Sequence, residues 1–234
     1  MKSTILDKTK LVNSVFSKVH KKYDLMNDIM SLGVHRIWKN KLIDWMNPQL
    51  NDSLIDVASG TGDIAKLFSK KINHSNSISC VEPNTEMYLV GKDNLKNFKN
   101  ITWHKAKAEK LPFKNDSFDF YTISYGIRNV SDINLSLKEA LRVLKPGGRF
   151  MCLEFSKVNN EMINFLYQNY SKTIPFIGKY IVGSSKPYDY LIKSINQFYS
   201  QKELFNLIKQ NGFSNIEYRN LSNGISAIHS GWKI

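Results

Sequence analysis

The sequence has little cysteine, little arginine and no long apolar run. Cys80 and Cys152 stand in segments expected to be strands, without a C-x-x-C pair or a histidine at ligand spacing. They are therefore expected to be core residues in a reducing compartment, and no metal site is expected. No run approaches the ~18 consecutive apolar residues of a membrane-spanning helix. Only five of the 33 basic residues are arginine, the residue preferred for bidentate recognition of bases and phosphates.

The totals indicate a soluble globular protein with an unusual charge. The 234 residues, 42% of them hydrophobic and 23% charged, are enough for one α/β domain with additions. The net charge of +13 is interpreted as a lysine-rich surface, which leaves contact with an anionic membrane or with nucleic acid open. The first 22 residues contain six lysines, one aspartate and no arginine, so neither a secretory signal nor a transit peptide is indicated. A cytoplasmic protein, or a processed organellar one, is expected.

A glycine turn between residues 54 and 63 organises the chain. It predicts a short apolar strand, a small-residue turn and the start of a helix at Asp63. Gly60 and Gly62 let a ligand approach bare backbone around Thr61, and the N–H groups of the helix point at that ligand. This pattern is typical of a doubly wound α/β sheet that binds a nucleoside at the carboxyl ends of its strands.

Two carboxylates favour S-adenosylmethionine as the ligand. Residues 60–65 fit G-x-G-x-x-A, so a dinucleotide is an alternative. Asp56, four positions before Gly60, would repel a pyrophosphate but could bind an amino group; its other interpretation is a helix cap. Glu82 ends the next predicted strand 21 positions after Thr61, where a carboxylate suits a ribose diol, as in NAD sites.

The N-terminal region predicts a helix from about Lys8, followed by a segment from Tyr23 to Trp38 that mixes polar and apolar residues. Such a mixture suits a lid over an apolar substrate with a polar head. The alternative is a helical pair packed on the sheet, with His35 and Trp38 on a buried face.

The remaining chain alternates between predicted strands and helices. The expected strands are 77–81, 101–105, 118–124, 149–155, 215–221 and 225–229, and the expected helices are 85–98 with Thr85 as cap, 132–144 with Asp132 as cap, 159–195 and 202–211. A loop at 106–113 makes Lys107, Ala108 and Glu109 candidates for contact with an adenine. After the fourth predicted strand, Ser124 to Asn129 lacks the Asn/Asp-Pro-Pro-aromatic motif of base N-methyltransferases, so no nucleic-acid substrate is expected.

Two segments resemble the signatures of the ubiquinone/menaquinone biosynthesis C-methyltransferase family. They are Tyr23-Asp24-x-Met26-Asn27-x-x-Met30-Ser31-x-x-x-His35-x-x-Trp38 and Arg142-Val143-Leu144-Lys145-Pro146-Gly147-Gly148-x-Phe150-x-x-Leu153-Glu154-x-Ser156, and the tail 227–233 is similar as well. The resemblance implies a class I S-adenosylmethionine methyltransferase with a Rossmann-like, seven-stranded, mostly parallel sheet, helices on both faces and an N-terminal helical lid. One domain over 1–234 is then expected, with a lid at 1–50, a cofactor-binding core at 51–156, and a helical insertion and closing strands at 157–234.

The resemblance also implies methyl transfer from S-adenosylmethionine to a ring carbon of a polyprenylated quinol. The family's cofactor contacts fall on Thr61, Glu82, Lys107, Ala108 and Ser124. The sequence departs from the family pattern where Ser59 replaces Gly, Glu82 replaces Asp, and Lys107 replaces Asn or Asp. The polyprenyl tail implies peripheral membrane contact, on the cytoplasmic side or, in a eukaryote, the mitochondrial matrix side. A quinone-biosynthesis complex or a homodimer is a further implied association.

The chemistry of the reaction assigns candidate roles. A ring carbon attacks a methyl group only after a neighbouring hydroxyl loses its proton, so a base or a cation must stabilise the phenolate. We expect His35 as base, Arg128 as phenolate stabiliser, and Tyr23 and Asp24 as orienting groups, without a metal because the leaving thioether is neutral. Two alternatives stay open, a non-catalytic scaffold and an RNA methyltransferase, as does the choice between benzoquinol and naphthoquinol.

Overall fold

The computed structural model describes residues 12, 17, 23–158, 160–182 and 185–234. Except for Val12 and Ser17, the helix expected from Lys8 lies outside them. The helical elements are α2 (Tyr23–Ser31), α3 (His35–Met46), α4 (Asp63–Lys71), α5 (Thr85–Asn94), η2 (Ile127–Asn129), α6 (Ile133–Val143), α7 (Glu161–Val182), α8 (Lys186–Gln197), α9 (Gln201–Gln210) and η3 (Ser222–Gly224). The strands are β1 (Leu54–Val57), β2 (Ile78–Val81), β3 (Ile101–His104), β4 (Phe118–Ser124), β5 (Leu144–Phe155), β6 (Ser214–Leu221) and β7 (Ser226–Trp232).

The strands form a seven-stranded sheet in the order β3-β2-β1-β4-β5-β7-β6. β1 to β5 run parallel, and β7 pairs antiparallel with both β5 and β6. The central strands β1 and β2 are buried at every position, because helices cover both faces of a parallel sheet. The predicted mostly parallel, Rossmann-like sheet is confirmed.

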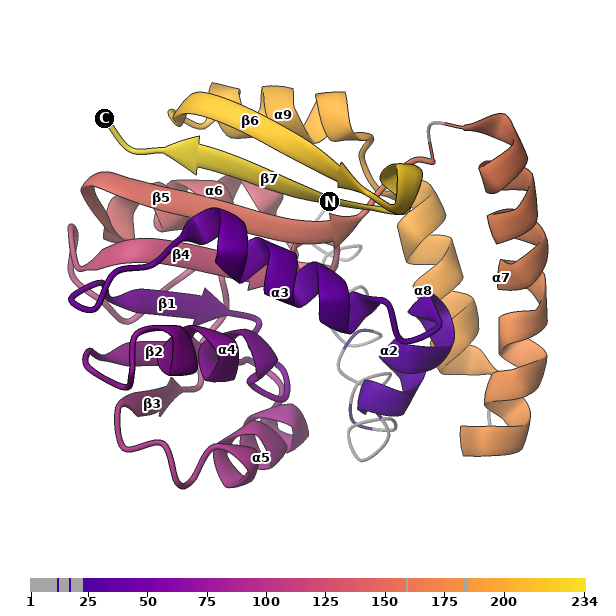
Figure 1. Cartoon of the computed structure of the whole chain (residues 1–234), viewed down its shortest axis with the longest axis horizontal. Helices are drawn as coiled ribbons and strands as arrows, with labels where there is room; N and C mark the ends of the chain where they lie inside the picture. Colours follow the sequence, from indigo (N-terminus) through magenta and orange to yellow (C-terminus); the bar gives the residue numbers. More distant parts are fainter. Residues whose placement is uncertain (1–11, 13–16, 18–22, 159, 183–184) are drawn as a thin grey trace.

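Helices cover the two faces of the sheet in separate apolar cores (Figure 1). On one face, α3 and α4 pack over Leu54 and Phe120, and Cys80 lies in this core. On the other face, α6 and α9 pack over Ile55 and Tyr121, and Cys152 lies there. Both cysteines are free and buried, as predicted. Beyond the carboxyl ends of the parallel strands stand α2, α7 and α8.

The connections at the middle of the sheet open a crevice. β1 and β4 are neighbours, but the chain leaves β1 for α4 on one face and leaves β4 for α6 on the other. Both exits begin with a left-handed residue, Ala58 with φ 53° and Tyr125 with φ 56°. A reversal of this kind is where open α/β sheets bind ligands.

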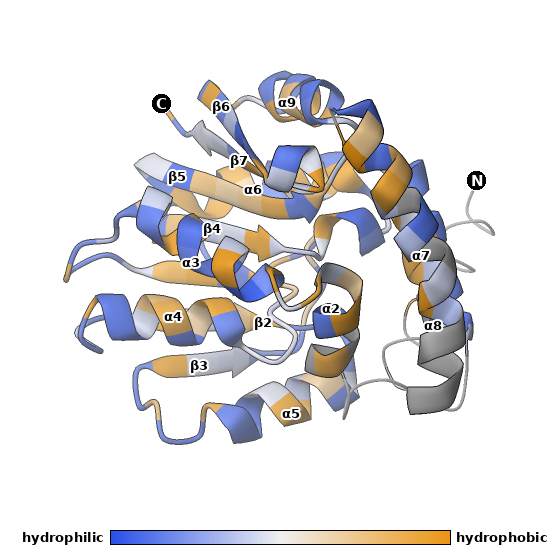
Figure 2. Cartoon of the chain, turned by 45° about the vertical axis from the view of Figure 1, so that its right-hand side comes forward, coloured by the Kyte–Doolittle hydropathy of each residue, from blue (hydrophilic) through white to orange (hydrophobic). Residues whose placement is uncertain are grey.

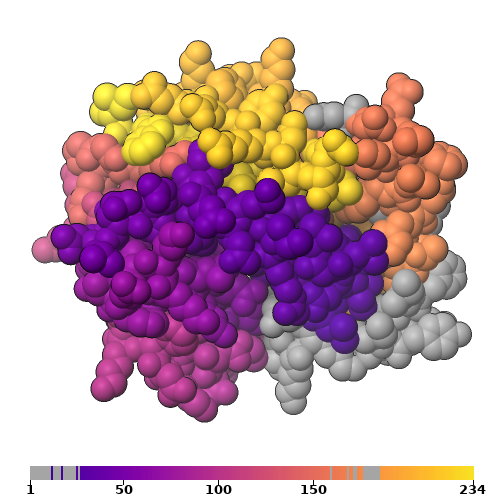
Figure 3. All heavy atoms as spheres, viewed as in Figure 1, coloured from indigo at the N-terminus to yellow at the C-terminus, as the bar shows by residue number. Residues whose placement is uncertain are grey.

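The N-terminal helices lie across the sheet rather than apart from it. Figure 3 shows the α2–α3 segment on the front of the molecule, between the first strands and the C-terminal strands. Trp38 is buried, donates from Nε1 to Ser222 Oγ at 3.1 Å, and meets the ring of Phe155 edge-on. The alternative of a packed helical pair with His35 and Trp38 buried therefore describes α3 correctly.

Several predicted boundaries were wrong. The helix expected at 85–98 ends at Asn94, and the strand expected at 225–229 runs from Ser226 to Trp232. Helix α5 is capped by Asn84, whose side chain accepts from the Met87 N–H, and not by Thr85. Strand β5 begins at Leu144, five residues early, because Leu144 pairs with Phe118 of β4 and because Gly147 and Gly148 exchange backbone hydrogen bonds with Lys233. The helical stretch 159–195 divides into α7 and α8. In the part of the chain that the structure describes, no helix is long and apolar enough to cross a bilayer.

Candidate functional site

A cavity of about 280 Å³ opens at the carboxyl ends of the central strands. Each of four strands contributes the residues that follow it: Gly60 after β1, Glu82 after β2, Lys107 and Ala108 after β3, and Tyr125 after β4. Glu109, another candidate for contact with the adenine, lines the cavity as well, so the structure brings together five of the predicted cofactor residues. Its walls are mainly apolar, which suits a nucleoside held by few polar groups.

Glu82 is the polar anchor of this cavity. Its carboxylate accepts hydrogen bonds from the backbone N–H of Gly60 at 3.0 Å and of Asn84 at 2.9 Å. Burial raises the pKa of Glu82 to about 7, although these two bonds oppose the shift. Each carboxylate oxygen has a second lone pair, so Glu82 can still accept the hydroxyl groups of a ribose.

The glycine turn is shaped by close packing as much as by ligand access. Gly62 has φ +89°, and a Cβ there would lie 2.5 Å from Leu95 Cδ1. Thr61 is buried, and its carbonyl accepts from the Asn94 side chain at 3.4 Å. Thr61, Gly62 and Asp63 do not line the cavity, so any contact they make with the cofactor stays a prediction.

Asp56 and Ser124 lie on the sheet face that α3 and α4 cover. Asp56 is fully buried; Oδ1 accepts from Thr122 Oγ1 at 2.7 Å, while Oδ2 has no partner within the described residues. Ser124 Oγ is likewise buried and unpartnered there. Burial raises the pKa of Asp56 to about 7. Helix α4 has Gly62 at its N-cap without a side-chain bond, so Asp56 is not a helix cap, and its open oxygen fits the expected amino group.

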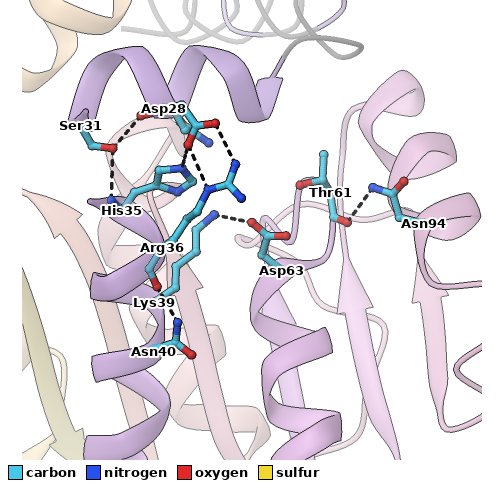
Figure 4. A network of polar contacts seen from close by, with 10 residues as sticks. Asp28, Ser31, His35, Arg36, Lys39, Asn40, Thr61, Asp63 and Asn94 are labelled. Atoms are coloured by element: carbon cyan, nitrogen blue, oxygen red, sulfur yellow. Dashed lines mark hydrogen bonds and ion pairs between the residues drawn. The ribbon is translucent and has the colours of Figure 1, made fainter. Parts of the chain in front are cut away.

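A second polar site surrounds His35 (Figure 4). His35 Nε2 lies 2.8 Å from Asp28 Oδ1, and Arg36 binds the same carboxylate at 2.8 Å. The hydrogen bond from Arg36 is the main cause that holds the pKa of Asp28 below its usual value. Because an ionised carboxylate only accepts, His35 must carry its proton on Nε2. Nδ1 is then a buried lone pair without a partner in the described structure.

One turn after His35 on α3, Lys39 extends its side chain to the start of α4. Its ammonium donates to Asp63 Oδ2 at 2.6 Å. Burial and the Lys39 charge lower the pKa of His35, against the effect of Asp28, so the imidazole is neutral at pH 7. His35, Lys39 and Asp63 line a cleft between α3 and α4.

Arg128 lies elsewhere, in a buried ion pair. It donates to Glu154 and to the Tyr125 carbonyl, and its guanidinium lies over the Phe155 ring with 5.6 Å to the centroid. Arg128 does not line the cavity, although its neighbour Asn129 does. Its role at the phenolate stays a prediction. The side chains of Tyr23 and Asp24 lie outside the described part of the structure.

Sequence reasoning missed several residues of these sites. Asp28 and Lys39 stand in or beside the polar segment 23–38, but only the contacts with His35 and Asp63 single them out. Tyr125 and Asn129, which line the cavity, gave no signal beyond their place after β4. The described residues contain no group of three or more His, Cys, Asp or Glu that could hold a metal ion.

Known proteins resemble this chain at two levels. A model of the ubiE/COQ5 methyltransferase family matches residues 3–233. The ubiquinone/menaquinone biosynthesis C-methyltransferase UbiE of Rickettsia bellii (strain OSU 85-389) is 51% identical, over 97% of this chain and 94% of the relative. The UbiE of Rickettsia prowazekii (strain Madrid E) is also 51% identical, over 96% and 93%.

Solved structures share the fold at much lower identity. A SAM-dependent methyltransferase from Thermotoga maritima has a TM-score of 0.67 at 20% identity, covering 94% of this chain and 99% of its own. Phosphoethanolamine N-methyltransferase 2 of Haemonchus contortus, in complex with phosphomonomethylethanolamine and S-adenosylhomocysteine, has a TM-score of 0.63 at 13% identity, covering 84% and 52%.

The geometry and the relatives lead to the same conclusion. The cavity lined by Glu82 fits the nucleoside of S-adenosylmethionine, and the unpartnered Oδ2 of Asp56 fits its amino group. The predicted cofactor and the predicted methyltransferase activity are confirmed by the family that matches. The chain belongs to the ubiE/COQ5 methyltransferase family.

Proposed function

We propose that this protein transfers a methyl group from S-adenosylmethionine to a ring carbon of a polyprenylated quinol, in ubiquinone or menaquinone biosynthesis. The observation that carries the proposal is the 51% identity to the Rickettsia bellii UbiE over 97% of the chain. The described site supports it, because His35, a buried histidine with a lowered pKa, lines the same cleft as Asp63, the first residue of α4 after the glycine turn.

When bound, S-adenosylmethionine supplies an electrophilic methyl group. The protein's task is then to make a ring carbon nucleophilic by removing the proton of a neighbouring hydroxyl. His35 suits this role, because Asp28 occupies Nε2–H and leaves the Nδ1 lone pair to accept a proton. Asp28 would orient the imidazole and stabilise the imidazolium that forms. Once the carbon is methylated, the ring loses its own hydrogen at that carbon as a proton and becomes aromatic again.

The test is methyl transfer from labelled S-adenosylmethionine to short-chain demethylated benzoquinol and naphthoquinol, both kept reduced. We expect label in at least one ring, and the ring that accepts it assigns the pathway. The oxidised quinones are the matched control, because they have no hydroxyl to deprotonate. Binding of S-adenosylhomocysteine without label in either ring would contradict the proposal and favour a non-catalytic scaffold.

Contact with a membrane surface is part of the proposal, because a polyprenyl tail partitions into lipid. Helix α7 supports it with an apolar ridge of Met162, Phe165 and Leu166, which are 70%, 67% and 60% exposed. Spacings of three and four residues place these side chains on one face of the helix, and Figure 2 shows apolar positions along this part of α7.

Vesicle sedimentation tests the ridge. Changing Met162, Phe165 and Leu166 together to glutamine should weaken binding to phosphatidylcholine–phosphatidylglycerol vesicles about tenfold or more, since each buried apolar side chain contributes about 1.5–3 kcal/mol. The matched control is Leu135→Gln on α6, which changes an exposed leucine on another element. Equal vesicle binding by the parent and the triple variant would reject the ridge as the contact.

A further inference from the structure

Lys39 is a buried cation on α3, and its observed contacts use little of its bonding capacity. Its side chain is 8% exposed, whereas lysine is rarely buried without a paired charge. It makes one hydrogen bond in the described structure, to Asp63 Oδ2 at 2.6 Å. An ammonium has three N–H donors, so two donors have no acceptor among the described residues. Its partner Asp63 is 39% exposed and can be solvated without Lys39.

The start of α4 adds a second positive feature beside Lys39. Asp63 is the first residue of this nine-residue helix, and the N-cap Gly62 provides no side-chain bond to its first N–H groups. The N-terminus of a helix attracts anions because its free N–H groups and its dipole act together. Figure 4 shows Lys39 reaching from α3 to this end of α4. Burial alone would raise the pKa of Asp63, but the charge and the hydrogen bond of Lys39, together with the nearby charges of His35 and Lys66, outweigh burial, so the net shift is downward.

An independent observation on the neighbouring strand points to a ligand. Asp56 Oδ2 is completely buried and has no partner in the described part of the chain. The Lys39 ammonium acts electrostatically on Asp56 as well as on Asp63. Gly60 lines the nucleoside cavity, and Asp63, three residues later, contacts Lys39. The glycine turn therefore connects the cavity to a buried cation and to a buried carboxylate with an open oxygen.

We propose that Lys39 binds the α-carboxylate of S-adenosylmethionine, while Asp56 Oδ2 receives its ammonium. An amino acid zwitterion needs one cation and one anion in these places, and the described structure provides one of each beside the turn. In the ligand-free protein the Lys39 ammonium is paired with Asp63, and the Asp63 side chain turns toward solvent when the cofactor carboxylate binds Lys39. The α3 helix, which precedes the glycine turn in the chain, thus holds one end of the cofactor.

This inference concerns the methyl donor and does not depend on which quinol accepts the methyl group. Titration calorimetry compares two ligands, S-adenosylhomocysteine and its decarboxylated analogue S-adenosyl-3-thiopropylamine. The analogue keeps the nucleoside, the thioether and the amine, and lacks only the carboxylate. Lys39→Met should weaken S-adenosylhomocysteine binding about 10- to 100-fold, the range for a hydrogen bond between charged groups. Its affinity for the analogue should stay within about twofold of the parent.

Two further variants control for charge and for folding. Lys66→Met removes an exposed positive charge from the same cleft and should leave the affinity for both ligands within about twofold. Lys39→Arg keeps the charge and should restore part of the affinity for S-adenosylhomocysteine. Urea unfolding verifies that each variant is folded, and Lys39→Gln replaces Lys39→Met if the latter is not.

The comparison of ligands decides the outcome. Selective loss of S-adenosylhomocysteine binding in Lys39→Met supports the assignment. Equal losses for both ligands would mean that Lys39 only maintains the shape of the turn, and no loss for either would mean that the carboxylate binds elsewhere. Either of these results overturns the inference, while methyl transfer to a quinol by the parent protein would still stand.

Discussion

Replacing Arg128 by methionine removes the positive half of a buried ion pair. Arg128 and Glu154 are 6% and 1% exposed, and Arg128 donates both to the Glu154 carboxylate and to the Tyr125 carbonyl. Burial raises the pKa of Glu154, and Arg128 opposes that shift. Without Arg128 the carboxylate has lost its countercharge in a site that water does not reach, so it must either stay ionised at high cost or take up a proton.

The expected cost is large enough to measure easily. Breaking a buried pair by removing one partner costs about 3–5 kcal/mol, which at about 2–4 °C per kcal/mol for a chain of this size lowers Tm by roughly 6–20 °C. Urea unfolding followed by far-UV circular dichroism gives the free energy of unfolding. The double variant Arg128→Met/Glu154→Gln should lose less than the sum of the single variants, because it leaves no unpaired charge.

A half-exposed pair provides the control. Lys145 and Asp119 have side chains 41% and 28% exposed, so Lys145→Met should cost no more than about 1 kcal/mol. If Arg128→Met stays within about 1 kcal/mol of the parent while turnover disappears and S-adenosylhomocysteine still binds, the structural reasoning is refuted. Arg128 would then act on the substrate, as the sequence suggested.

Three further predictions concern ionisable groups. Burial raises the pKa of Asp56 to about 7, so the stability of the ligand-free protein falls as pH rises from about 4 to 7. In urea unfolding, Asp56→Asn should remove this loss, and the same variant should bind S-adenosylhomocysteine more weakly. An Asp56→Asn variant less stable than the parent at pH 8 would contradict the reasoning. Burial lowers the pKa of His229 to about 4, so stability falls by roughly 3 kcal/mol as pH drops from about 6.5 to 4, and His229→Gln should flatten that fall. Asp28 raises the pKa of His35, so Asp28→Asn should reduce turnover and move the acidic limb of the pH–rate profile to lower pH; an unchanged profile would exclude His35 as the base.

Local patterns predicted most of the fold because each element carries its own signal. The four-residue strand at Leu54 and the glycine turn after it were located from apolar runs and small residues. The cap of α5 was misplaced by one residue because Asn84 and Thr85 both make good caps, and only Asn84 reaches the Met87 N–H. The early start of β5 depends on pairing with Phe118 of β4 and on hydrogen bonds with Lys233, near the end of the chain, so no local pattern could reveal it.

The candidate site was predictable only where strand ends determine it. Gly60, Glu82 and Ala108 gather in one cavity because parallel strands end at the same edge of the sheet. The pairs Lys39–Asp63 and Arg128–Glu154 join residues 24 and 26 positions apart, at distances that depend on how α3 and η2 pack. Sequence spacing therefore suggested His35 and Arg128 as reactive groups but could not reveal that Arg128 already has a buried partner.

The crevice between β1 and β4 owes its position to chain connectivity, since α4 and α6 depart to opposite faces of the sheet. No single side chain creates this crevice. Substitutions of the residues around it therefore change which ligand binds, but the position of the binding site in the fold stays the same. The half that faces the glycine turn is built from backbone and strand ends, whereas the outer half is built from helices such as α2, α7 and α8 that are not part of the sheet. We therefore expect that exchanging these outer helices between relatives would transfer preference for the methyl acceptor while the donor end keeps its affinity. The sheet thus fixes the binding site of the methyl donor, whereas helices outside the sheet determine the binding site of the methyl acceptor.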